Sequence, residues 1–148
     1  MKKLTFIYSL LLTFFLVSCD RSTTDEPTNE ATVRVLTTNP WKVDKITDLN
    51  GNVINTASLP EQSKALFGIN IQFSDDKTVR AIDPIARTVI NGGTWNFLDN
   101  EKTLDIDIKD LKGQFPINKL ERSRMVLLNK ITYNGLTFNV NLELVPAL

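Results

Sequence analysis

The chain has 148 residues, with 17 basic and 17 acidic side chains, one cysteine and no histidine. The lack of histidine excludes Ser-His-Asp triads, histidine proton shuttles and histidine metal sites, and the balanced charge gives no electrostatic case for nucleic acid. The length suits one domain with a real hydrophobic core, and not two.

The amino-terminal segment has the pattern of an export signal. Lys2 and Lys3 precede residues 4–17, in which Leu, Ile and Phe dominate. This run is shorter than the ~20 apolar residues of a transmembrane helix, and no stop-transfer pattern follows it. We therefore predict a signal peptide over residues 1–18 that is not part of the fold.

The only cysteine comes directly after this run. Residues 16–19, Leu-Val-Ser-Cys, resemble the bacterial lipobox. The resemblance implies that the Cys19 thiol carries a diacylglyceryl group, that the chain is cut before Cys19, and that the new amino terminus is acylated with a chain such as palmitate. Two or three acyl chains give stable membrane attachment. Two other interpretations stay open: a plain secretory peptide in which Cys19 has no role, and an uncut signal anchor.

A polar segment follows Cys19. Residues 20–30 contain no aromatic side chain and no large aliphatic one, so we predict a flexible tether over residues 19–31 and one domain over residues 32–148. Asp20, Asp25 and Glu26 resemble the acidic export signals of Bacteroidetes surface lipoproteins, although a solvated linker has the same composition. The expected location is the outer membrane of the cell envelope, on its periplasmic or surface face.

The rest of the chain repeatedly alternates apolar and polar residues. In residues 104–109, for example, Leu and Ile alternate with Asp and Lys, which is typical of a half-buried antiparallel strand. Strands are predicted at residues 41–48, 52–56, 69–74, 77–83, 86–98 with a break near Gly92, 103–109, 114–121, 123–133 and 136–145.

Turns and short helices separate these strands. Asn134-Gly135 is typical of a type I′ hairpin turn, and the apolar pattern slips between Val43 and Ile46, which predicts a β-bulge. Residues 30–37 and 59–68 have the pattern of short helices. Short antiparallel strands in up-and-down order avoid exposed edges by closing, so we predict an all-β antiparallel barrel of about eight strands.

Several motifs, in this order, carry a family resemblance. They are Trp41 after a helical lead, the hairpin at residues 73–79, Gly-Thr-Trp at 93–95, Lys-Thr-Leu-Asp-Ile at 102–106, and residues 117–120 followed by 124–127. Together they resemble the lipocalin-like lipoproteins of Bacteroidetes over residues 32–145, which implies a lipocalin-like (calycin) barrel. Classical lipocalins carry Gly-x-Trp on the first strand, where this chain has Asn39-Pro40-Trp41.

The predicted interior is made almost wholly of large apolar side chains. Its members are Trp41, Val43, Ile71, Phe73, Val79, Trp95, Phe97, Leu104, Ile106, Ile117, Leu120, Met125, Leu127, Phe138, Val140 and Leu142. Such a set favours a packed core over a ligand cavity, because ligand pockets add a few placed polar groups. If a ligand is bound, we expect Trp41, Leu66, Phe67 or Trp95 to contact it at one open end of the barrel.

The charged residues form no catalytic or metal-binding signature. Asp105 and Asp107 share the polar face of a strand, and Asp75-Asp76 has the composition of a turn. A basic group lies along the seventh and eighth predicted strands, at Lys119, Arg122, Arg124 and Lys130. It either contacts an anionic glycan, a headgroup or a partner's acids, or it keeps the strands soluble.

No cofactor, metal or catalytic residue is predicted. The leading function is non-enzymatic binding, by a lipid-anchored protein, of a small apolar ligand or of a glycan or protein partner. The alternative is a structural or interaction module with a solid barrel, accessory to a surface uptake complex. A third interpretation is an enzyme that uses carboxylates alone, which needs two acids facing each other across a cleft.

Overall fold

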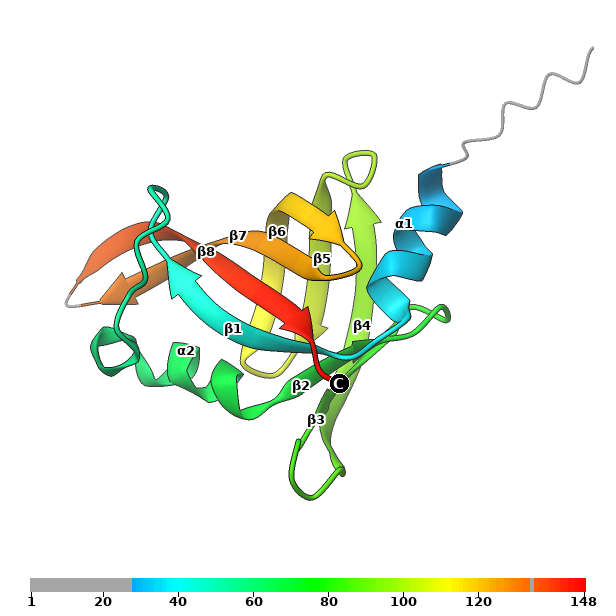
Figure 1. Cartoon of the computed structure of the whole chain (residues 1–148), viewed down its shortest axis with the longest axis horizontal. Helices are drawn as coiled ribbons and strands as arrows, with labels where there is room; N and C mark the ends of the chain where they lie inside the picture. Colours follow the sequence, from blue (N-terminus) through cyan, green and yellow to red (C-terminus); the bar gives the residue numbers. More distant parts are fainter. Residues whose placement is uncertain (1–27, 134) are drawn as a thin grey trace, which may run out of the picture.

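Eight strands follow one another along the chain, and each pairs antiparallel with the next. The computed structural model describes residues 28–133 and 135–148; the predicted signal peptide, Cys19 and most of the predicted tether lie outside this range. β1 also pairs with β8, which closes the sheet into a barrel (Figure 1). The prediction of a closed up-and-down antiparallel barrel is therefore confirmed.

The element bounds agree closely with the alternation of the sequence. The strands are β1 (Trp41–Thr47), β2 (Asn70–Phe73), β3 (Thr78–Ile82), β4 (Val89–Leu98), β5 (Thr103–Ile108), β6 (Leu111–Glu121), β7 (Arg124–Tyr133) and β8 (Leu136–Pro146). The helical elements are α1 (Thr28–Thr37), η1 (Thr56–Ser58), α2 (Glu61–Ala65) and η2 (Leu66–Gly68). The register between β1 and β8 shifts between Val43 and Lys45, which confirms the predicted bulge.

Two local predictions are wrong. No strand forms over residues 52–56: Val53 makes one isolated bridge to Thr47, and the chain then enters η1. The Asp48 carboxylate accepts hydrogen bonds from the backbone N–H of Asn52 at 2.8 Å, and Asn55 caps η1, so local side-chain bonds replace the ladder. The other error is the break near Gly92, because β4 is continuous through it.

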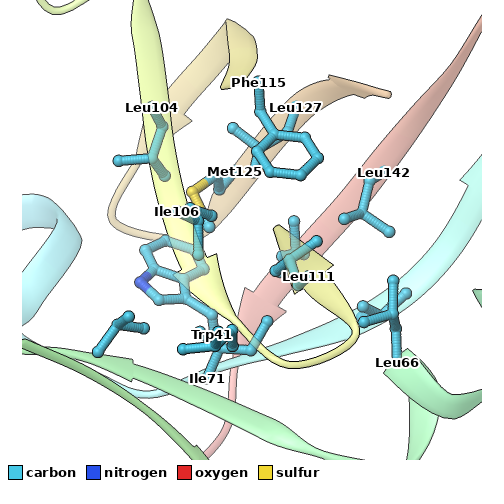
Figure 2. Packing of buried hydrophobic residues seen from close by; sticks show 14 of the residues in the cluster. Trp41, Leu66, Ile71, Leu104, Ile106, Leu111, Phe115, Met125, Leu127 and Leu142 are labelled. Atoms are coloured by element: carbon cyan, nitrogen blue, oxygen red, sulfur yellow. The ribbon is translucent and has the colours of Figure 1, made fainter. Parts of the chain in front are cut away.

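The core fills the middle of the barrel. Figure 2 shows Trp41, Ile71, Ile106 and Met125 grouped between the strands, and each is at most 1% exposed. Most of the predicted interior is buried, whereas Phe97, Ile117 and Leu120 are half-buried and pack against the core. Phe138 departs from the prediction, because it is 47% exposed.

The α1 end of the barrel is closed. α1 contacts β2 and β6, and its Leu36 is fully buried. The indole N–H of Trp41 donates a hydrogen bond of 2.8 Å to the backbone oxygen of Leu36, which joins the first strand to this helix. Figure 1 shows α1 on the right and the far ends of β7 and β8 on the left. A surface hollow of about 370 Å³ lies at this end between α1 and the β2–β3 turn, and is lined by Glu30, Val33, Arg34, Thr37, Asp75 and Lys77.

Within the described residues, none of the helices has both the length and the apolar character needed to span a bilayer.

Candidate functional site

The opposite end of the barrel, which we call the mouth, is where β1, β3, β5 and β7 end. The segment between β1 and β2 crosses it and carries α2 and η2. Leu59 and Leu66 of this segment are 2% exposed and belong to the core cluster, so they fix the segment against the barrel. A hydrophobic anchor on each side of α2 therefore positions this short helix over the mouth.

The barrel is split beside the mouth, between β6 and β7. β6 pairs with β7 only from Ile117 to Glu121. Toward the mouth, residues 111–116 of β6 pair with β5 alone, and residues 128–133 of β7 pair with β8 alone. Each of these half-strands therefore presents a free edge to the other.

The sequence gives a physical reason for this split. Pro116 is the residue next to Ile117, at which the β6–β7 ladder ends. Proline has no N–H to donate to a neighbouring strand and is confined to edges, strand starts and bulges. On the β7 side, the backbone N–H of Lys130 bonds to the Asn129 side chain at 2.7 Å. The split is thus built into both strands by their own side chains.

A hollow of about 260 Å³ opens at the mouth, between α2, the β5–β6 turn and the free half of β7. We call it the mouth hollow. Its apolar walls are Leu66, Leu111, Phe115 and Ile131, all buried, and they come from three elements, η2, β6 and β7. Figure 2 shows Leu66, Leu111 and Phe115 lying along this side of the core.

Polar groups surround these apolar walls. Ser63 of α2 is 7% exposed, and Asn129 of β7 is half-buried. The other polar lining residues are Gln62, Asp110, Lys112, Lys130 and Thr132. The hollow therefore combines apolar walls with a polar rim that is the larger part of its lining, whereas most small-molecule sites are predominantly apolar.

A second hollow, the split groove, lies along the free edges of β6 and β7. It measures about 280 Å³ and is lined by Lys112–Pro116 on one side and by Leu128–Lys130 on the other. Lys112, Phe115, Asn129 and Lys130 line both hollows. The mouth hollow and the split groove therefore meet along the split.

The four predicted ligand contacts do not gather at one place. Leu66 lines the mouth hollow, whereas Phe67 packs half-buried against the core. Trp41 and Trp95 are buried, and the indole N–H of Trp95 donates to the backbone oxygen of Ser74 at 2.9 Å. Both indole N–H groups are thus bonded to backbone oxygens inside the fold.

Trp95 lies in an aromatic group near the closed end. Its ring meets those of Phe73 and Phe97 edge to face, at centroid distances of 5.8 and 5.3 Å. The Lys77 ammonium lies 4.1 Å from the centroid of the Trp95 ring, at the distance of a cation–π contact. Trp95 therefore ties the β2–β3 turn to the core.

The members of the predicted basic group lie in different environments. Arg124 bonds to Glu143 at 2.6 Å, and Lys119 to Glu121 at 3.1 Å. Lys130, by contrast, lines both the mouth hollow and the split groove. The sequence thus identified Lys130 within a larger basic group, and its partners Lys112, Phe115 and Ile131 were missed as site residues.

The carboxyl groups whose pKa is shifted lie in turns. The pKa of Asp48 is lowered by its hydrogen bond from the Asn52 side chain, that of Asp76 by the Thr78 hydroxyl, and that of Asp83 by backbone N–H groups of the β3–β4 turn. Across residues 28–133 and 135–148, no three Asp, Glu, Cys or His side chains are grouped so as to hold a metal ion. The shifted acids are explained by local turn structure.

Comparisons with known proteins give a likeness of fold. No protein-family model matches the sequence, and no curated protein matches it. The chain is similar to a deswapped triple mutant of bovine odorant binding protein, with 22% identity, 74% of this chain and 72% of that chain covered, and a TM-score of 0.40. It is also similar to bovine odorant binding protein in complex with a selenium-containing odorant, with 20% identity, coverage of 78% and 73%, and a TM-score of 0.42. Function is therefore inferred below from the residues of this chain.

Proposed function

We propose that this chain is a non-enzymatic, lipocalin-like binding protein that holds a small apolar molecule in the mouth hollow. The observation that supports the proposal is the composition of the hollow: apolar walls from Leu66, Leu111, Phe115 and Ile131, with Ser63 and Asn129 beside them. Small-molecule pockets typically measure ~300–1,000 Å³. The hollow, at about 260 Å³, lies just below this range, so it suits only a small ligand.

The test uses an uncharged fluorescent probe and two phenylalanine variants of one helix. N-phenyl-1-naphthylamine brightens when it leaves water for an apolar site, so saturable binding to the full chain is expected. Gln62 lines the mouth hollow and Glu61, its exposed neighbour, does not. Gln62→Phe should fill the hollow and weaken binding about tenfold, which corresponds to about 1.4 kcal/mol.

Glu61→Phe serves as the matched control, because it adds the same ring to the same helix outside the hollow. It should leave the affinity within about twofold, a change well under 1 kcal/mol. A probe that never saturates, or that binds equally well to both variants, would refute a ligand site at the mouth.

We further propose that the protein is a lipoprotein of the cell envelope, held at the outer membrane by lipid on Cys19. The support is the lipobox-like sequence at residues 16–19 after an apolar run. Labelled palmitate should enter the wild-type protein in cells and should be lost in Cys19→Ala. Label that persists unchanged in Cys19→Ala would contradict the anchor.

One observation favours the alternative function, an interaction module of a surface complex. Tyr133, Leu136 and Phe138 leave between 43% and 62% of their surface exposed near the end of the β7–β8 hairpin. Exposed apolar groups of this kind are typical of contact surfaces. If the probe fails to bind, a protein partner on this hairpin becomes the better interpretation.

A further inference from the structure

The β3–β4 hairpin projects beyond its neighbours at the mouth. β4 pairs with β3 from Val89 onward, but its pairing with β5 begins only at Thr94, opposite Asp107. β5 ends at Ile108, so residues 89–93 of β4 have no β5 partner and form a free sheet edge. Figure 1 shows the turn of this hairpin projecting below the rest of the barrel.

The backbone at Gly92 is placed to bond to another strand. The N–H of Trp95 donates to the backbone oxygen of Lys77 at 2.9 Å, so it faces the β3 side. Successive residues of an antiparallel strand direct their backbone groups to alternate sides, which turns the N–H and C=O of Gly92 away from β3. β5 has already ended at this level, so the ladder supplies no partner there.

The side chains along this edge are apolar and exposed. Val89 and Ile90 leave 55% and 53% of their surface exposed, and Ile85 in the turn leaves 92%. Sheet edges that stay unpaired are commonly blunted by lysine or proline, as the edges of the split are at Pro116 and Lys130. The β4 stretch, Val-Ile-Asn-Gly-Gly, has no charged side chain and no proline. It is therefore suited to pairing with a further strand.

Charges of both signs lie at each end of this edge. The β3–β4 turn at the outer end carries Asp83 and Arg87, and the β5–β6 turn at the inner end carries Lys109 and Asp110. None of these four side chains makes an ion pair within the described residues. When two copies of the edge run antiparallel, the outer end of each copy meets the inner end of the other. Each turn then brings an acid to a base and a base to an acid, as a self-complementary interface requires.

We propose that this chain forms a two-fold homodimer in which the free edges of β4 pair antiparallel and Arg87 of each copy lies beside Asp110 of the other copy. Val89 and Ile90 of the two copies then cover each other. The shared ladder is short, because Ile90 opposes no residue of β3, and such a bulge sharpens the twist of the strand. Small interfaces are weak, so we expect a dissociation constant on the order of 10–100 μM.

Sedimentation equilibrium of the full chain in a density-matched neutral detergent measures this association. A reversible equilibrium between monomer and dimer is expected. Ile90→Lys places a charge on the free edge and should raise the dissociation constant at least about tenfold. Leu136→Lys is the matched control, because Leu136 is also an exposed apolar residue but lies on the β7–β8 hairpin. It should leave the dissociation constant within about twofold.

A charge exchange tests the arrangement of the two copies. Arg87→Asp and Asp110→Arg should each weaken the dimer about three- to fivefold, and the double variant should restore it, because opposite charges again meet across the two-fold axis. Hydrogen exchange tests the same edge without any substitution. The amides of residues 89–93 should gain protection as the protein concentration rises through the dissociation constant.

Three outcomes would overturn the homodimer. One is a chain that stays monomeric at millimolar concentration. Another is a dimer that Leu136→Lys dissociates and Ile90→Lys does not, which would place the contact on the β7–β8 hairpin. The third is a double charge variant that dimerises more weakly than either single variant.

Discussion

Phe138 lies directly opposite Ile131 in the β7–β8 ladder, yet Ile131 is 7% exposed and Phe138 is 47% exposed. Residues that face each other in an antiparallel pair project to the same side of the sheet. Both side chains therefore point to the inner side of the sheet, but Ile131 is covered by its neighbours more completely than Phe138. The β7–β8 hairpin continues past the point where the rest of the barrel can bury it.

This difference predicts unequal effects of truncation. Ile131→Ala should lower the free energy of unfolding by about 2–4 kcal/mol, because it removes a buried side chain from the wall of the mouth hollow. Phe138→Ala should cost less than about 1 kcal/mol, as surface substitutions do. Urea unfolding of the two variants measures the difference, and equal losses would show that the hairpin is packed along its whole length.

A close backbone contact predicts that Gly93 cannot be replaced. A Cβ atom at Gly93 would lie 1.6 Å from the backbone oxygen of Asp107, whereas one at Gly92 would lie 3.5 Å from its nearest neighbour, the backbone oxygen of Val79. Gly93→Ala should therefore cost at least about 3 kcal/mol, since β4 and β5 must move apart.

Gly92→Ala is the control for this substitution, because it adds the same methyl group one residue away. Its cost should stay within about 1 kcal/mol. Thermal unfolding compares the two variants, and equal melting temperatures would argue against the close approach of β4 and β5.

Glu143 has a buried carboxylate on the outer face of the barrel, and we predict that this group contributes to stability and not to binding. Glu143 is 6% exposed and lies 2.6 Å from Arg124, 3.1 Å from the Thr47 hydroxyl and 3.7 Å from Lys45. Glu143→Gln should destabilise by about 1–3 kcal/mol, since Arg124 is 44% exposed and water partly screens the pair.

Glu121→Gln provides the comparison, because its pair with Lys119 is exposed on both sides. Its cost should be about 0.5 kcal/mol or less. Denaturant titrations at low and high salt check both variants, and a loss for Glu143→Gln no larger than for Glu121→Gln would mean that the Glu143 cluster adds nothing to stability.

The β2–β3 turn predicts a pH-dependent stability. Asp76 accepts hydrogen bonds from the hydroxyl and the backbone N–H of Thr78, at 2.6 and 3.0 Å, and these bonds hold the pKa of its carboxyl below the ordinary value. A carboxyl whose pKa is lower in the folded state contributes stability above its unfolded pKa and loses it as the pH falls through the folded pKa. Asp76→Asn should therefore lower the melting temperature at neutral pH, and the gap to wild type should close in acid.

Asp75→Asn controls for the loss of a charge in the same turn. Within the described residues the Asp75 side chain makes no hydrogen bond or ion pair, so the melting temperature of Asp75→Asn should differ little from that of wild type at every pH. A gap between wild type and Asp76→Asn that stays constant down to strong acid would contradict the role of the Asp76 carboxylate.

The helices and the strands were predictable where the pattern is local. Period-two alternation marks strands such as β2, β5 and β8, and the slip between Val43 and Ile46 marks the bulge in β1. The error at residues 52–56 has a local cause as well, because Asp48 and Asn55 use their side chains to bond the backbone there. Such side-chain competition leaves little trace in a hydrophobic pattern.

The site was harder to predict than the barrel. The sequence alone gives no reason to distinguish Lys130 from Lys119 and Arg124, which belong to the same predicted basic group. Separating them requires knowing that Glu121 and Glu143 lie beside the other two, and that Lys130 borders the split. Pro116 was the one local signal for the split, since proline is rare inside a central strand.

The sequence by itself determined that this chain forms antiparallel strands with one apolar face, and that histidine chemistry is excluded, because alternation and composition are properties of the chain alone. Only the tertiary structure decided how far each strand is covered by its neighbours, which is why Phe138 stays half-exposed and why β6 and β7 separate at Pro116. The physical reason is that period two fixes the side to which a residue points, whereas burial and cavities depend on the lengths and registers of strands that meet only when the barrel closes.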